Sequence, residues 1–147
     1  MKYEKYQLES DRKLLLFEFT SVGPKGRIKK IVQYAETNLK DYYNLGFGDK
    51  QETTGEIDDT TITNNGDSQK VLATVASTVY AFTDKHPGTW IHAKGSNIAR
   101  TRLYRIGITN NLLEIKKDFE VYGLKDNQWH SFQKHVDNEA FLITRKK

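Results

Sequence analysis

The chain has 147 residues, of which 37% are hydrophobic and 12% aromatic, and its formal net charge is +4. This composition excludes a disordered chain, and the length predicts one domain, residues 1–147, with its own core. No apolar run is long enough for a membrane span or a secretory signal, and cysteine is absent, so we expect a cytoplasmic protein without disulfides or thiolate zinc sites.

The amino-terminal third of the chain predicts three strands and a loop. Residues 14–22 are apolar on both faces, which is typical of a central strand. A turn at residues 23–26, Gly-Pro-Lys-Gly, leads into a second strand over 27–36. Residues 42–48 predict a third strand, and the polar, threonine-rich residues 51–64 predict a loop.

A long helix is predicted over residues 68–85. Val71, Val75 and Val79 recur at every fourth position, which gives one apolar stripe along a helix of about five turns. Proline and glycine at residues 86–88, His-Pro-Gly, end it.

A short strand and a second helix follow. Residues 89–94 predict a strand that carries Trp90, His92 and Lys94 on one face. After a turn at Gly95-Ser96, a helix is expected over residues 97–110. Its expected buried stripe consists of Ala99, Leu103 and Ile106.

The carboxyl-terminal part predicts a hairpin and a last strand. Residues 119–124 and 128–132 flank a turn, and residues 140–143 form the last predicted strand. The order is β-β-β-α-β-α-β-β with one further strand. It favours an α+β fold with a largely antiparallel sheet of five to seven strands and two main helices.

Four segments of the chain together resemble a known protein family. They are Asn64-Asn65-Gly66-Asp67, Lys70-Val71-Leu72-Ala73-Thr74-Val75, Gly95-Ser96 and Ala99-Arg100-Thr101-Arg102-Leu103-Tyr104-Arg105. In this order and spacing they resemble a family of roughly 150-residue proteins, found mostly in Bacteroidetes and classed as a domain of unknown function. The resemblance implies a bacterial cytoplasmic protein and supplies no catalytic residues.

Charge is distributed unevenly along the chain. Residues 49–67 contain six acidic side chains and one basic side chain, whereas residues 85–105 contain five basic side chains and no acidic one. Such blocks are typical of separate solvated faces, and a basic block also suits an anionic partner.

The strand–Gly–Ser–helix segment is the best candidate for a binding site. Ser96 is a suitable N-cap, and the first turn of the helix carries no Asp or Glu, so its unpaired N–H groups and partial positive charge suit a phosphate or carboxylate. The candidate ligand-binding residues are Trp90, His92, Lys94, Gly95, Ser96, Asn97, Arg100, Arg102 and Arg105.

The three arginines are not expected to act as one clamp. On a helical wheel Arg102 and Arg105 share one flank, and Arg100 lies on the other. Trp90 and His92 on the preceding strand suit stacking against a nucleotide. The structural alternative is that the glycine only makes the turn, the serine only caps the helix, and the arginines pair with the acidic segment 49–67.

The sequence leaves three functions open. The first is a binding module for nucleic acid or a nucleotide. The second is a protein-interaction component of a small bacterial operon pair, in which basic and acidic segments meet across two chains. The least favoured is a metal-dependent phosphodiesterase or transferase. The acidic segment lacks the spacing of an EF-hand, so no metal site and no cofactor are predicted.

Overall fold

The computed structural model describes residues 3–58 and 63–147. The described residues form eight strands and three helices. In chain order these are β1 (Glu9–Ser10), β2 (Leu16–Gly23), β3 (Gly26–Glu36), β4 (Tyr42–Asp49), α1 (Ser68–Lys85), β5 (Trp90–Ala93), α2 (Ile98–Asn110), α3 (Leu112–Asp118), β6 (Phe119–Lys125), β7 (Gln128–Ser131) and β8 (Ala140–Arg145). Residues 59–62 of the predicted loop lie outside the described residues.

One mixed sheet organises these elements. Its strand order is β1-β2-β3-β4-β5-β8-β6-β7, and every neighbouring pair is antiparallel except β4 and β5. Helix α1 is the crossover that joins this parallel pair, as parallel neighbours require. The α+β class predicted from the sequence is therefore confirmed. None of the helices in the described part of the chain is long and apolar enough to cross a membrane.

The predicted numbers of strands and helices were too low. Strand β1 has only two residues, which are too few to show an alternating pattern in the sequence. Its Glu9 pairs with Glu18 of β2. A single residue, Asn111, separates helix α3 from α2, and the seven residues of α3 are too few for a clear apolar stripe. Strand β2, predicted to be central, has only this two-residue strand on its outer side.

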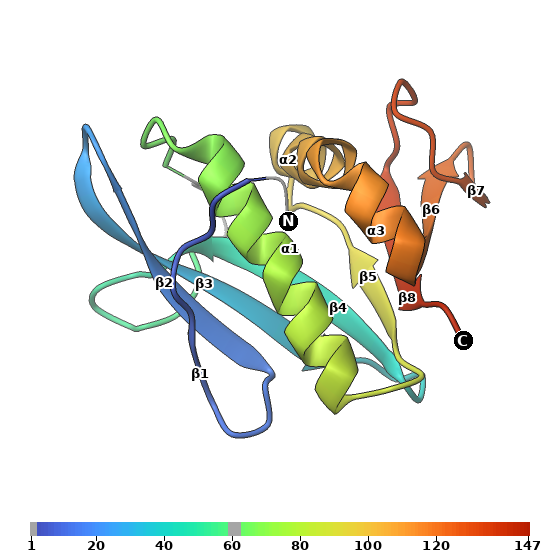
Figure 1. Cartoon of the computed structure of the whole chain (residues 1–147), viewed down its shortest axis with the longest axis horizontal. Coiled ribbons are helices and arrows are strands. Elements are labelled where there is room, and N and C mark those ends of the chain that lie inside the picture. Colours follow the sequence, from blue (N-terminus) through green and yellow to red (C-terminus); the bar gives the residue numbers. More distant parts are fainter. Residues whose placement is uncertain (1–2, 59–62) are drawn as a thin grey trace.

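The helices lie on one side of the sheet, with α1 crossing it obliquely and α2 and α3 beside it (Figure 1). Between the two layers lies the core, where Phe17, Val32 and Phe47 of the sheet meet Val75 and Phe82 of α1. The apolar stripe predicted for α1 is buried as expected. No described helix covers the opposite face of the sheet, and the candidate site lies at one end of the layered structure.

The stripe predicted for α2 was wrong. The helix buries Arg100, Thr101, Tyr104, Gly107 and Ile108. Gly107 faces Leu72 of α1 closely enough that an added Cβ would lie 3.4 Å from the leucine side chain. With α2 packed in this orientation, Tyr104 enters the core. The residues of the predicted stripe, Ala99, Leu103 and Ile106, stay at least partly exposed.

A buried ion pair ties the sheet to the segment that precedes α1. Lys30 of β3 is 1% exposed, and its Nζ lies 2.5 Å from Oδ1 of Asp49 on β4. Nζ also donates to the Thr63 carbonyl at 2.9 Å, and the Thr63 N–H donates to Oδ2 of Asp49 at 3.0 Å. Lys30 and Asp49 thus neutralise each other's charge, and each also forms a hydrogen bond with the backbone of Thr63. Buried charges need such partners.

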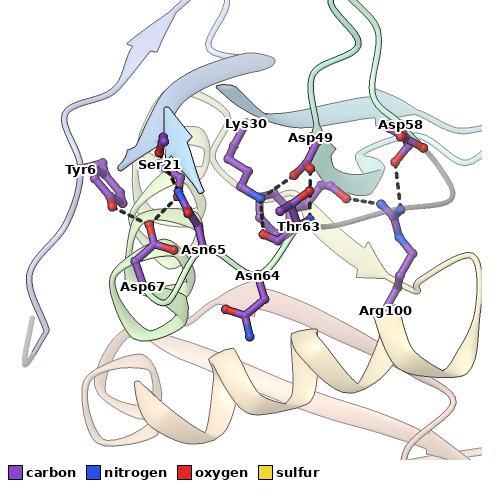
Figure 2. Close-up of polar contacts among 12 residues, drawn as sticks. Tyr6, Ser21, Lys30, Asp49, Asp58, Thr63, Asn64, Asn65, Asp67 and Arg100 are labelled. Carbon is purple, nitrogen blue, oxygen red and sulfur yellow. Dashed lines mark hydrogen bonds and ion pairs between the residues drawn. The ribbon is translucent and has the colours of Figure 1, made fainter. Parts of the chain in front are cut away.

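A second polar cluster fixes the start of α1. Asp67 is the N-cap residue of the helix, and its Oδ2 accepts from the hydroxyls of Tyr6 and Ser21, at 2.5 Å each (Figure 2). The Asn65 side chain donates to the Gly26 carbonyl at 2.9 Å and accepts from the Lys25 N–H at 2.7 Å. The Asn-Asn-Gly-Asp segment is therefore a structural joint between the β2–β3 hairpin and α1.

We predict that Asp49→Asn destabilises the fold strongly, because it leaves the ammonium of Lys30 buried without a counter-charge. Such a change costs about 3 kcal/mol, measured as the free energy of unfolding in urea. The double variant Lys30→Met/Asp49→Asn removes the charge itself and should recover part of this loss. Equal stability of Asp49→Asn and the wild type would show that the pair does not hold the hairpin to the α1 segment.

Candidate functional site

The site begins where β5 stops. The last residue pair between β4 and β5 is Leu45 with Ala93, whereas β4 continues to Asp49. Beyond Leu45, no described strand pairs with the edge of β4 that faces β5, and only at its end does the Asp58 N–H donate to the Asp49 carbonyl, at 2.8 Å. In open α/β sheets, ligands bind outside the carboxyl ends of parallel strands, and this opening lies at the carboxyl end of the β4–β5 pair.

Arg100 of α2 closes part of this open edge. Its Nη2 donates to the Phe47 carbonyl of β4, and its Nη1 donates to the Asp58 carbonyl at 2.9 Å (Figure 2). Arg100 as a residue is 7% exposed, and its guanidinium binds main-chain oxygens in place of a neighbouring strand. Both of these hydrogen bonds go to peptide carbonyls, whose dipoles compensate part of the positive charge.

Tyr104 lies one helical turn after Arg100 and lines the same region. Burial raises the pKa of its hydroxyl to about 12, partly offset by the charge of Arg100 and by a hydrogen bond with the Phe47 backbone. The phenol is therefore neutral at physiological pH and adds a polar, uncharged group to the wall. Its position depends on the rotation of α2 that Gly107 permits.

A cavity of about 420 Å³ lies between the end of β5, the part of β4 that extends past β5, and the start of α2. Its basic lining side chains are His92, Lys94 and Arg100. The described residues that line it include no carboxylate. The remaining lining residues are Asn44, Leu45, Gly46, Phe47, Ile57, Gly95, Ser96 and Tyr104. The arrangement is a concave, positively charged crevice at the end of the parallel pair.

The turn into α2 is shaped by close packing. The Gly95 N–H donates to Oγ1 of Thr101 at 3.0 Å, and a Cβ on this glycine would lie only 2.4 Å from the Thr101 nitrogen. The residue that caps α2 is Asn97, whose Oδ1 accepts from the Arg100 N–H at 2.9 Å, so the prediction that Ser96 is the N-cap was wrong. The first turn carries no acidic residue, as predicted.

His92 connects the cavity to the helix-free face of the sheet. Its Nδ1 lies 3.1 Å from Oδ1 of Asn44, which is its paired neighbour on β4. Burial, and then the charge of Lys94, lower the pKa of this imidazole below its ordinary value. The ring is thus mostly neutral at pH 7, and an anion placed near it would favour the charged form.

The structure brings together five of the nine residues selected from the sequence. His92, Lys94, Gly95, Ser96 and Arg100 line the cavity. The other four lie elsewhere. Asn97 caps α2 and Trp90 lies two residues before His92 on the same sheet face, whereas Arg102 is exposed outside the cavity and Arg105 lies 3.5 Å from Asp137.

Sequence reasoning missed the residues that β4 contributes to the cavity wall, and it missed Tyr104 of α2. Asn44 and Gly46 come from β4, and Tyr104 was noted only as a neighbour of Arg100. The pairing of β4 with β5 places them there, and no local pattern in the sequence indicates that pairing. No group of three His, Cys, Asp or Glu side chains within residues 3–58 and 63–147 is arranged to hold a metal ion.

We predict that Gly95→Ala destabilises the protein by about 2 kcal/mol, because the new methyl group would collide with the backbone of α2. Gly46→Ala is the matched control, since its Cβ would make two ordinary contacts, with Ile57 at 3.5 Å and with the Gln33 carbonyl at 3.9 Å. Thermal unfolding measures both variants. A Gly95→Ala protein that unfolds at the wild-type temperature would mean that the glycine serves something other than this packing.

Comparison with known proteins gives one match. Residues 2–146 match the family described as "Family of unknown function (DUF6934)". Neither a curated protein nor a solved structure matches the chain. Because the match spans nearly the whole sequence, the chain belongs to this family of unknown function.

Proposed function

We propose that this protein is a binding module for an anionic ligand, and that the cavity at the end of β5 receives a phosphate group of a nucleotide or a nucleic acid. The observation that carries the proposal is the composition of the cavity wall, with three basic side chains and no carboxylate among its described residues. As part of this proposal, we expect the protein to act in the cytoplasm of a bacterium, with Bacteroidetes as the expected source.

Three kinds of positive potential converge on this crevice. Lys94 is exposed and can move toward a ligand, whereas Arg100 is buried and fixed by two carbonyls. The amino-terminal turn of α2, free of acidic residues, adds the partial charge of the helix dipole. Partial burial strengthens such interactions relative to bulk water.

The wall also offers groups that recognise more than charge. The Asn44 amide and the neutral Tyr104 hydroxyl can exchange hydrogen bonds with sugar or phosphate oxygens. The volume of about 420 Å³ is in the range of small-molecule sites. These features support a phosphorylated organic ligand over a bare inorganic ion.

We predict that Lys94→Gln weakens binding of uridine 5′-monophosphate about tenfold, because it removes a charged donor to the phosphate. Arg102→Gln is the matched control, since it removes the same charge from an exposed position outside the cavity. Isothermal titration calorimetry at low salt measures both. Equal losses in the two variants, or no measurable binding by the wild type, would refute the proposed site.

Binding is also expected to strengthen as the pH falls from 7 to about 5.5. The pKa of His92 is low in the free protein, and a bound anion raises it, so binding takes up a proton below the ordinary imidazole value of about 6.5. The ligand's own phosphate titrates in this range, so the informative quantity is the difference between the wild type and His92→Gln. Parallel pH profiles of the two proteins would contradict this role.

A further inference from the structure

The helix-free face of the sheet carries a group of aromatic side chains next to the cavity. We call this group the aromatic face, and it consists of Tyr42, Trp90, His92, Tyr122 and Trp129. Strand register places these residues on the same side of the sheet, because Tyr42 pairs with Trp90, and His92 and Tyr122 both pair with Leu142. The helices lie on the other side (Figure 1).

The rings contact one another across four strands. The Tyr42 and Trp90 rings are stacked with centroids 5.9 Å apart, and Trp90 lies 6.2 Å from Tyr122. Trp129 of β7 reaches over the sheet to His92 of β5, with centroids 6.2 Å apart and planes at 78°. The Trp129 side chain is nevertheless 42% exposed. A large tryptophan held by other rings and still open to solvent is a ready stacking surface.

The aromatic face and the cavity share one residue, His92. Its paired neighbour Asn44 also lines the cavity and lies on the helix-free side of β4. A phosphate in the cavity therefore lies next to His92, which is also part of the aromatic face. Further nucleotides of a strand that is bound there would extend over the aromatic face toward Trp129.

We infer that the ligand of this site is single-stranded nucleic acid, with its backbone in the cavity and its bases stacked on the aromatic face. The inference rests on the proposed function and specifies its ligand. Sites for small molecules enclose most of the ligand surface, whereas this face is a sheet surface with no helix over it, on which Trp129 is exposed and the other four rings are partly exposed. Open aromatic sheets beside a basic groove suit unpaired bases, because every base has a face that can stack.

The charges at the two ends of the aromatic face agree with this orientation. His92, Lys94 and Arg100 lie at the cavity end. At the other end, exposed Glu120 of β6 is level with Trp90, since both pair with Thr144. A phosphodiester backbone is therefore attracted to the cavity end and repelled from the opposite one, which fixes where the strand enters.

A length series tests the inference. The probes are uridine 5′-monophosphate, a single-stranded hexauridylate and an RNA duplex, and binding is followed by fluorescence anisotropy or calorimetry. We expect the hexauridylate to bind at least about tenfold more tightly than the mononucleotide, and the duplex to bind more weakly than the hexauridylate, because paired bases are not available for stacking.

Trp129→Ala locates the effect on the aromatic face. We expect it to weaken hexauridylate binding at least about fivefold, whereas mononucleotide binding changes less than about twofold. The control is Leu113→Ala, which removes another exposed apolar side chain, 80% exposed on α3. Circular dichroism confirms that both variants are folded.

The outcomes separate this inference from the proposed function. A hexauridylate that binds no more tightly than the mononucleotide refutes the inference and leaves anion binding in the cavity standing. Hexauridylate binding that is lost in Lys94→Gln but unchanged in Trp129→Ala also refutes it, and assigns the aromatic face to another partner such as a protein. Failure of every probe to bind refutes the proposed function itself.

Discussion

The short length of β5 is the constraint on which the rest of the site depends. The strand stops at Ala93, while its parallel neighbour β4 continues for four residues past the last shared pair. Peptide groups on an open sheet edge need partners, and in this protein the guanidinium of Arg100 binds the Phe47 carbonyl. Replacing a strand by a cationic side chain leaves both a gap and a positive charge at the same place.

Several distant contacts hold this arrangement in position. The Lys30–Asp49 pair and the Asp67 cluster attach the chain that precedes α1 to the β2–β3–β4 part of the sheet. Glycines at the turn into α2 and within α2 let the helix approach the β5 turn and α1 closely. Asp49 and Asp67 therefore serve internal joints. At the end of β5, the exposed side chain of Lys94 remains accessible to a ligand, whereas Arg100 is buried.

Features that depend on neighbouring residues in the sequence could be predicted, whereas features that depend on tertiary contacts could not. The borders of α1 and the hairpin strands could be predicted, because valine spacing, turns and alternation are local signals. The two-residue β1 and the seven-residue α3 could not, since neither is long enough to show a period. The orientation of α2 was wrong because a buried arginine and Gly107 decided it, and both act through tertiary contacts. For the same reason the sequence pointed to His92, Lys94 and Arg100 but not to Asn44 or Trp129.

The end of β5 and the adjoining aromatic face are expected to bind the ligand together. Nuclear magnetic resonance of the ¹⁵N-labelled protein during titration with hexauridylate tests this most directly. We predict that the largest shifts fall on the amides of residues 44–46 and 92–97 and on the indole N–H of Trp129. A different cavity, of about 490 Å³, lies on the β2–β3 side, and its charged lining residues are Arg27, Lys29, Lys50, Glu9 and Glu18. Shifts concentrated there, with residues 92–97 unchanged, would contradict the claim.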